Sequence, residues 1–154
     1  MKILMVCLGN ICRSPLAEGI LKKKIKDANL NVEVASAGFV SYHQGDPADR
    51  RAISTAAQFG VDLSKHKASI FTKKCFDLFD YIYVMDEANL NDVLSISRDK
   101  EDHKKVDFIM NELYPGENRI VPDPYYGEAE DFVHVYKMLD IACDAILEKI
   151  KREK

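Results

Sequence analysis

Short apolar segments alternate along this sequence with segments of helical character, and this alternation constrains the fold more than any other feature. Residues 2–6 form a short apolar run that ends just before Gly9, as a buried strand does. Residues 31–35 alternate polar and apolar side chains, and residues 80–85 are rich in β-branched and aromatic side chains. Both patterns predict strands. A fourth strand is expected at residues 105–110.

Capping residues predict where the first two helices begin. Ser14 and Pro15 are expected to act as N-cap and first helical residue of a helix that ends near Asp27. The segment 46–49, Asp-Pro-Ala-Asp, predicts a second helix start of the same kind, and Gly60 is expected to end that helix.

Two further helices are expected in the second half of the chain. The third begins at residues 86–89, and the charged residues 92–105 after it predict a surface segment. In residues 132–150, apolar side chains recur every three or four positions, which predicts a long amphipathic helix. Strands that alternate with helices predict an α/β fold with a parallel sheet covered on both faces. The 154 residues predict a single domain, 1–154.

The charge balance excludes several classes of partner. Lys and Arg number 22 and Asp and Glu number 25, which gives a net charge of −3. This balance predicts no overall positive field to attract nucleic acid or an anionic membrane. The chain also has no run of roughly 18 apolar residues that would predict a transmembrane helix, and its N-terminal apolar run is too short for a secretory signal. We therefore expect a cytoplasmic protein without nucleic-acid or membrane partners.

The four cysteines, Cys7, Cys12, Cys75 and Cys143, have spacings that fit neither a CxxC redox motif nor a zinc site. In the reducing cytoplasm they are expected to be thiols, and no metal site is predicted. A free cysteine usually packs as a small hydrophobic residue, and this is our interpretation of Cys75 and Cys143. Cys143 lies on the apolar stripe of the last predicted helix.

The loop after the first strand has the composition of a phosphate cradle. Residues 7–15 read Cys-Leu-Gly-Asn-Ile-Cys-Arg-Ser-Pro, without the Gly-Lys-Ser/Thr ending of a nucleotide-binding P-loop. Gly9 and Asn10 tolerate a positive φ, so successive backbone N–H groups can point into one concavity. The following helix N-terminus adds further amides, and Arg13 adds a planar fork for two phosphate oxygens. In a parallel sheet, ligands bind at this edge.

Cys7 is predicted to lie at the floor of this positively polarised loop. Such surroundings favour the thiolate, which is a strong nucleophile without a separate general base. Ser14 can either cap the helix or donate its hydroxyl to the sulfur, and the sequence alone leaves both roles open.

Cleavage of a phosphate ester also requires an acid for the departing oxygen and a base for the attacking water, and one carboxyl can serve as both. Asp123 is the candidate, because Pro122 and Pro124 stiffen its segment in an extended conformation. A simple Asp-Pro turn is the alternative interpretation. Tyr125 and Tyr126 follow directly and could form walls for an aryl ring.

The segment Val-Cys-Leu-Gly-Asn-Ile-Cys-Arg-Ser-Pro, residues 6–15, resembles the signature of the low-molecular-weight protein tyrosine phosphatases. The resemblance continues in order along the chain through residues 36–38, 42–45, 49–52, 66–68, 79–82, 85–86, 89–90 and 123–127 and the final helix. It implies a three-layer α/β/α fold with a central four-stranded parallel sheet and helices on both faces. It also implies hydrolysis of phosphotyrosine and other aryl phosphate monoesters through a phosphocysteine intermediate, without metal or cofactor.

The same resemblance implies a role for each matching residue. Cys7 is expected to be the nucleophile, Arg13 the phosphate-binding arginine, and Asp123 the general acid and then base, with Ser14 completing the catalytic group. The implied substrate-binding residues are Leu8, Gly9, Asn10, Ile11, Cys12, Tyr42, Tyr125 and Tyr126. The implied substrates are phosphotyrosine proteins or small aryl phosphates, the product is inorganic phosphate, and the expected state is a monomer, with weak self-association as the alternative.

Two positions outside the motifs carry further expectations. His66 matches a family position that hydrogen-bonds the phosphate loop from behind, whereas His43, His103 and His134 are expected in surface or structural roles. Tyr42 matches a rim position often occupied by tryptophan in relatives. This chain has no tryptophan, so a smaller wall is expected there.

Three other functions are considered. Thiol-dependent arsenate reduction requires a relay of further cysteines, which Cys75 and Cys143 do not provide. Relatives that hydrolyse arginine phosphate carry threonine where Ile11 stands, and the bulky apolar Ile11 favours an aryl ester. A phosphotyrosine-binding adaptor would lack the nucleophile, the arginine or the acid, and all three are present.

A disulfide between Cys7 and Cys12 is a further hypothesis, in which the disulfide protects the Cys7 sulfur against irreversible oxidation.

Overall fold

Four parallel strands form the central sheet of the computed structural model, which describes residues 1–153. The strands are β1 (Lys2–Val6), β2 (Glu33–Ala37), β3 (Tyr81–Val84) and β4 (Val106–Phe108). They lie in the order β2-β1-β3-β4, and every pairing is parallel. The parallel sheet expected from the alternation of strands and helices is therefore confirmed.

The strand order places β1 between its neighbours and makes its end the switch point of the sheet. The chain leaves β1 toward β2 and then crosses back to β3 on the other side, so Val6 pairs with both Ala37 and Val84. Connections that diverge from one strand leave a crevice beyond its carboxyl end. The loop that follows Val6 opens into this crevice.

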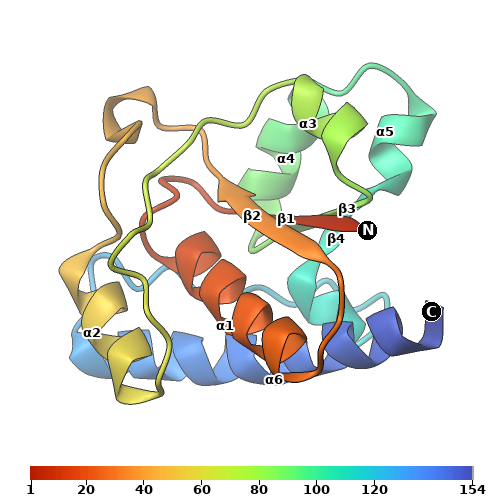
Figure 1. Ribbon diagram of the computed structural model, residues 1–154. Coiled ribbons are helices and arrows are strands. Elements are labelled where there is room, and N and C mark those ends of the chain that lie inside the picture. Colours follow the sequence, from red (N-terminus) through yellow and green to blue (C-terminus); the bar gives the residue numbers. More distant parts are fainter. Residues whose placement is uncertain (154) are drawn as a thin grey trace.

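Helices cover both faces of the sheet (Figure 1). The helices are α1 (Arg13–Asp27), α2 (Arg50–Gln58), α3 (Lys74–Leu78), α4 (Glu87–Ser95), α5 (Lys100–Lys104) and α6 (Ala129–Glu153), with 3-10 turns η1 (Ser41–His43) and η2 (Ile109–Glu112). Helices α1, α2 and α6 lie on one side and α3, α4 and α5 on the other. Strand β1 serves both layers, because Ile3 and Met5 belong to one buried cluster and Leu4 and Val6 to the other. The three-layer α/β/α fold is confirmed.

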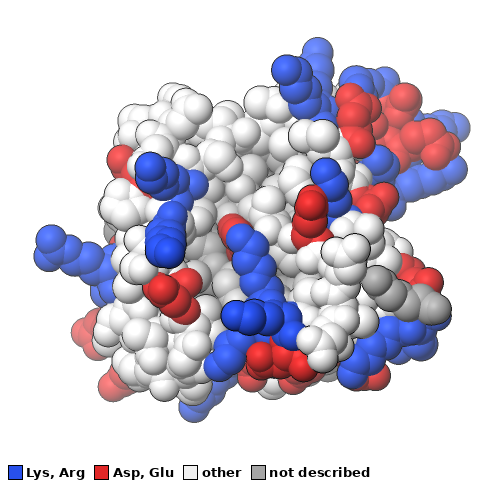
Figure 2. All heavy atoms as spheres, in the orientation of Figure 1, with Lys and Arg blue, Asp and Glu red and all other residues white. Residues whose placement is uncertain are grey.

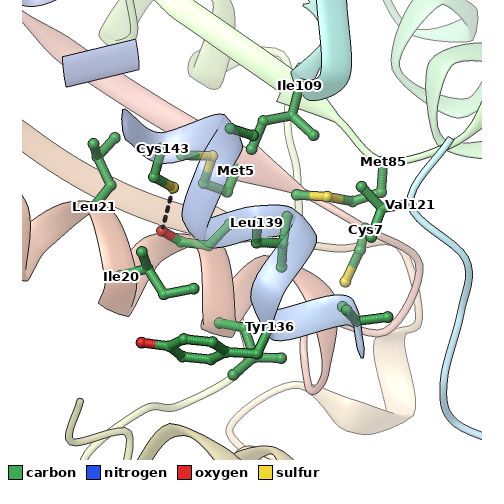
Figure 3. Packing of buried hydrophobic residues seen from close by; sticks show 14 of the residues in the cluster. Met5, Cys7, Ile20, Leu21, Met85, Ile109, Val121, Tyr136, Leu139 and Cys143 are labelled. Atoms are coloured by element: carbon green, nitrogen blue, oxygen red, sulfur yellow. Dashed lines mark hydrogen bonds between the residues drawn. The ribbon is translucent and has the colours of Figure 1, made fainter. Parts of the chain in front are cut away.

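The long helix α6 provides most of the packing under α1. Its buried side chains are Phe132, Val135, Tyr136, Leu139, Ala142, Cys143, Ile146 and Ile150, which repeat with the period of a helix. Figure 3 shows Cys143 directed toward α1, where its sulfur contacts the carbonyl oxygen of Ala17 at 3.7 Å. Cys75 is also buried, in the opposite layer. Both cysteines therefore pack in the core as expected.

The predicted helix starts were wrong at both capping sites. Helix α1 begins at Arg13 with Cys12 as its N-cap, two residues before the position predicted from Ser14 and Pro15. Helix α2 begins at Arg50, and its cap is Asp49 rather than a residue at 46 or 47. In α1 the Ser14 hydroxyl is engaged by Asn10 and the Cys7 sulfur instead of capping the helix, and in α2 the second aspartate of the segment 46–49 provides the cap.

Other boundaries differ by smaller amounts. Strand β2 lies two residues later than residues 31–35, and Gly60 ends α2 with a φ of 79° as expected. The charged segment 92–105 contains the end of α4 and the short helix α5, and α3 was not predicted. None of the helices in residues 1–153 combines the length and the apolar character that a membrane crossing requires.

On the face drawn in Figure 2, basic and acidic side chains are interspersed and neither sign dominates. This distribution agrees with the small net charge of −3.

Candidate active site

The loop between β1 and α1 forms the floor of a cavity of about 150 Å³ at the switch point of the sheet. The cavity is lined by Cys7, Leu8, Gly9, Ile11, Cys12, Arg13, Val40, Tyr42, His43, Asp123, Tyr125 and Tyr126. The cavity thus brings together segments from the first and last thirds of the sequence. Of the catalytic, substrate-binding and supporting residues implied by the resemblance, Asn10, Ser14 and His66 do not line the cavity, and these three lie behind its floor.

Asn10 fixes the conformation of the floor. Its φ is 56°, whereas Gly9, which would also tolerate a positive φ, does not adopt one. The fully buried Asn10 side chain accepts a hydrogen bond from the Ser69 amide at 2.8 Å and donates to the Ser14 hydroxyl at 2.8 Å. A side-chain amide that bonds locally compensates for the strain of the left-handed region.

His66 supports the same residue from behind. Its Nε2 lies 2.7 Å from the carbonyl oxygen of Asn10, so the imidazole holds the backbone of the loop directly. It reaches Ser14 only through the Asn10 side chain. His66 therefore lies behind the loop between β1 and α1, in the position expected for it.

Ser14 is directed at the Cys7 sulfur and does not cap the helix. Its Oγ lies 3.0 Å from the Cys7 sulfur and accepts a hydrogen bond from Asn10. Because that bond uses an acceptor site of the hydroxyl, the Ser14 proton remains available for the sulfur. The N-cap Cys12 makes no capping bond either, so the first-turn amides of α1 remain open to an anion.

Arg13 is held in place by groups from two distant segments. The residue is 2 % exposed, and its Nη1 donates to Asp86 at 2.6 Å and to the carbonyl oxygen of Val121 at 2.9 Å. Its Nη2 lies 3.7 Å from a carboxylate oxygen of Asp123. A buried, charge-assisted pair of this kind fixes the plane of the arginine fork before any ligand arrives. Asp86 is a positioning residue that the sequence suggested only as a helix start.

Asp123 forms the predicted turn and also lines the cavity. Its Oδ1 accepts a hydrogen bond from the Tyr125 amide at 3.0 Å, which is an Asp-Pro turn. The same carboxyl lines the cavity and remains 39 % exposed. The turn therefore places the carboxyl at the mouth of the site, facing Arg13.

Aromatic side chains form the rim of the cavity. Tyr42 and Tyr126 are highly exposed, and Tyr125 packs edge-on against Tyr126 at 5.0 Å between ring centres. His43, which was expected only in a surface or structural role, lines the cavity and hydrogen-bonds Asp46 at 3.0 Å. Its ring packs against Tyr42 in a tilted arrangement, with 4.4 Å between ring centres. Val40 was also missed. The only available signal for both was their proximity to Tyr42 in the sequence.

Cys12 differs from Cys7 in its surroundings. Burial, reinforced by the negative charge of Asp49, raises the pKa of the Cys12 thiol well above that of a free cysteine. Cys12 therefore remains a neutral thiol at physiological pH, while Cys7 is the sulfur that contacts Ser14. Within residues 1–153, no cluster of three or more His, Cys, Asp or Glu side chains is arranged to hold a metal ion.

Gly38 allows the loop of residues 7–12, called the phosphate loop below, to lie directly against the end of β2. A Cβ atom at this position would come within 2.7 Å of the Leu8 carbonyl oxygen and 2.8 Å of the Asn10 nitrogen. Because both are backbone atoms, a Gly38→Ala variant must displace the loop. We expect a loss of about 1–3 kcal/mol in unfolding free energy and of about 10-fold or more in turnover. Urea unfolding and steady-state kinetics measure the two effects, and unchanged kinetics would contradict this placement.

Comparisons with known proteins agree with this geometry. The sequence model of the family described as low molecular weight phosphotyrosine protein phosphatase matches residues 2–154. A human protein of that name is 41% identical over 96% of this chain and 94% of its own length. A Synechocystis protein named as a putative low molecular weight protein-tyrosine-phosphatase is 39% identical over 99% of this chain and 98% of its own length.

Solved structures show the same relationship. A protein tyrosine phosphatase from Entamoeba histolytica, crystallised with Hepes in its active site, superposes with a TM-score of 0.92 at 34% identity, covering 99% of this chain and 98% of that one. Wzb from Vibrio vulnificus superposes with a TM-score of 0.85 at 34% identity, covering 96% and 97%. With the family model matching almost the full sequence, the chain belongs to the low molecular weight phosphotyrosine protein phosphatase family.

Proposed function

We propose that this chain hydrolyses phosphotyrosine and other aryl phosphate monoesters through a phosphocysteine intermediate on Cys7. The observation that carries the proposal is one cavity that holds the Cys7 sulfur, the Arg13 fork and the Asp123 carboxyl, beneath an aromatic rim. These are the three groups that a metal-independent transfer of a phosphoryl group to cysteine requires.

The first step transfers the phosphoryl group to sulfur. The Cys7 thiolate attacks phosphorus and the bond from phosphorus to the phenolic oxygen breaks, while Asp123 donates its proton to that oxygen. Arg13 and the loop amides hold the equatorial oxygens, where negative charge develops. Since Asp86 and Val121 already fix Nη1 of Arg13, the guanidinium needs little reorganisation for this task.

The second step returns the enzyme to its starting state. Water attacks phosphorus, Asp123 accepts its proton, and the bond between phosphorus and sulfur breaks to release inorganic phosphate. The Ser14 hydroxyl, 3.0 Å from the sulfur, can donate a hydrogen bond to the departing thiolate. Ser14 therefore acts on the leaving group of this step.

The walls of the cavity favour an aryl ester. Leu8, Ile11, Val40 and Tyr125 provide apolar surface around the floor, which suits a flat ring more than a charged guanidinium group. The Wzb structure from Vibrio vulnificus is a complex with benzylphosphonate, a ligand with the same combination of ring and phosphorus group. We infer phosphotyrosine proteins or small aryl phosphates as the substrates.

Turnover of simple phosphate monoesters tests the proposal. The protein should hydrolyse phosphotyrosine and p-nitrophenyl phosphate in the presence of a chelator, and should act much more slowly on glycerol phosphate and arginine phosphate. Binding of phosphotyrosine without turnover would instead identify an adaptor, and faster hydrolysis of arginine phosphate would overturn the assignment of the substrate class.

The disulfide hypothesis for Cys7 and Cys12 remains a prediction. Peroxide would oxidise the Cys7 thiolate to the sulfenic acid, and the Cys12 sulfur would then form the disulfide with release of water. A thiol reductant should restore activity to the oxidised protein, whereas oxidised Cys12→Ser should not recover. The control Cys75→Ser, in the opposite layer of the core, should recover like the wild type. Full recovery of Cys12→Ser would exclude the disulfide.

We also infer a monomer that acts in the cytoplasm, with weak self-association as the alternative. All four cysteines are free in the structure, which suits a reducing compartment. Light scattering over a range of protein concentrations tests the monomeric state, and cell fractionation tests the cytoplasmic location.

A further inference from the structure

Arg51, in the first turn of α2, contacts the segment that carries Asp123. Its side chain is 36% exposed, yet Nη2 donates to the carbonyl oxygen of Tyr125 at 2.8 Å and Nη1 donates to that of Gly127 at 3.0 Å. The guanidinium also lies over the Phe132 ring, 4.5 Å from its centre. One side chain thus binds two carbonyl groups of the segment that follows the acid, and also the start of α6.

The segment 121–127, called the acid loop below, needs such an attachment. Its beginning is fixed, because Val121 donates to the Met85 carbonyl oxygen at 2.8 Å and accepts from Arg13. Beyond Val121, the hydrogen bonds from the Tyr125 amide to Asp123 and from the Gly127 amide to the Pro124 carbonyl oxygen are internal to the loop. Within the described residues, the hydrogen bonds that tie this second half to another part of the fold come from Arg51.

Asp49 holds the other side of Arg51. The carboxylate accepts from Nε at 3.1 Å and from Nη2 at 3.0 Å, and it also caps α2 through the Arg51 amide. Burial alone would raise the pKa of Asp49, but the hydrogen bonds from Arg51 outweigh it and hold that pKa below its usual value. The pair is therefore charged on both sides at neutral pH, and its fork geometry is fixed.

Asp49 is in turn bonded to the floor of the active site. Its backbone N–H donates to the carbonyl oxygen of Ile11 at 2.8 Å. A continuous series of contacts therefore runs from the phosphate loop through Asp49 and Arg51 to the acid loop.

We infer that Arg51 is a positioning residue that holds the acid loop over the phosphate loop, so that the Asp123 carboxyl meets the ester oxygen of the substrate. The inference rests on the proposed function, because it assigns Arg51 to the protonation of the leaving group. Small displacements of a reacting group cause large losses of rate. A lysine could keep the charge pair with Asp49, but it lacks the rigid fork that binds two carbonyl groups together.

The test compares two esters that depend differently on the acid. Phosphotyrosine releases a weakly acidic phenol and needs protonation, whereas p-nitrophenyl phosphate releases a more acidic phenol and needs it less. We expect Arg51→Gln to lower kcat/KM for phosphotyrosine by about 10-fold or more, with a clearly smaller loss for p-nitrophenyl phosphate. Arg51→Lys should be intermediate. The inference is decided by the ratio of the loss in kcat/KM for phosphotyrosine to the loss for p-nitrophenyl phosphate, because kcat/KM reports the first chemical step.

Arg50 supplies the matched control. It is the exposed neighbour of Arg51, and its side chain has no hydrogen bond or ion pair within residues 1–153. Arg50→Gln should leave both kcat/KM values close to wild type. This variant removes the same charge from the same helix turn, so a general electrostatic effect on substrate binding would appear in it as well.

Equal losses for both esters in Arg51→Gln would assign Arg51 a merely structural role and overturn the inference, as would no loss at all. If Arg51→Gln does not fold, the ratio measured for Arg51→Lys decides in the same way. Asp123→Asn, measured in parallel, separates the two proposals. If Asp123→Asn shows the dependence on the leaving group and the Arg51 variants do not, only the role of Arg51 fails. If Asp123→Asn shows none, the proposed mechanism fails and this inference with it.

Discussion

A Cys7→Ser variant is expected to bind aryl phosphates while its turnover falls by about 10⁴-fold or more, the scale of loss on removal of a catalytic nucleophile. The serine hydroxyl would occupy the position of the sulfur, 3.0 Å from Ser14, so the phosphate cradle would remain. A hydroxyl is a weak nucleophile unless an adjacent base removes its proton. The hydrogen-bond partner that the structure shows for the Cys7 sulfur is Ser14, itself a neutral hydroxyl. Steady-state hydrolysis of p-nitrophenyl phosphate and equilibrium binding of inorganic phosphate measure the two properties.

A second cysteine provides the control for this experiment. Cys75 is buried in the layer of the core that faces away from α1 and α6, so Cys75→Ser should keep its turnover even if its unfolding free energy falls. Turnover of Cys7→Ser at the wild-type rate would falsify the mechanism. A variant that binds without turnover would also serve to capture physiological phosphotyrosine substrates.

Asp123→Asn is expected to lower kcat/KM for phosphotyrosine by about 10²- to 10⁴-fold, the contribution usual for a general acid. The amide has the shape of the carboxyl, and its oxygen can still accept the hydrogen bond that the Tyr125 amide gives to Oδ1 at 3.0 Å. The turn is thus preserved and only the proton is lost. The loss should be smaller for p-nitrophenyl phosphate, because its leaving group departs without full protonation.

Glu130→Gln is a suitable comparison for that variant. It removes a negative charge from an exposed residue in the first turn of α6, near the acid loop in sequence but outside the residues that line the cavity. Its kinetics should match the wild type. An equal fall in kcat/KM for both esters of Asp123→Asn would exclude proton donation as the role of this carboxyl.

The sequence was most informative where neighbouring residues alone determine the local structure. The run from β1 through the following loop to α1 is local, and the predicted strand and helix are both present, with the loop between them lining the cavity. The start of α1 was misplaced because the same hydroxyl can serve two partners. In the folded protein the Ser14 oxygen binds Asn10 and contacts the Cys7 sulfur, so it is unavailable as a cap.

Contacts between distant segments could not be predicted in this way. Arg13 and Asp86 are 73 residues apart, and Arg51 and the Tyr125 carbonyl are 74 apart. No local pattern links such pairs, and the acceptor in the second is a backbone group that every residue possesses. The helices α3 and α5 were missed for another reason, since five residues are too few to show a helical period.

Phosphate affinity and the choice of ester are expected to depend on different groups in the floor of the cavity. In the proposed mechanism, peptide N–H groups supply much of the attraction for the phosphate group, because every residue except proline carries one and Arg13 is already paired with Asp86. Substitutions at Leu8 or Ile11 would change the apolar walls and leave those donors in place. The choice of ester could therefore diverge among related enzymes, or be redesigned, at little cost to phosphate affinity.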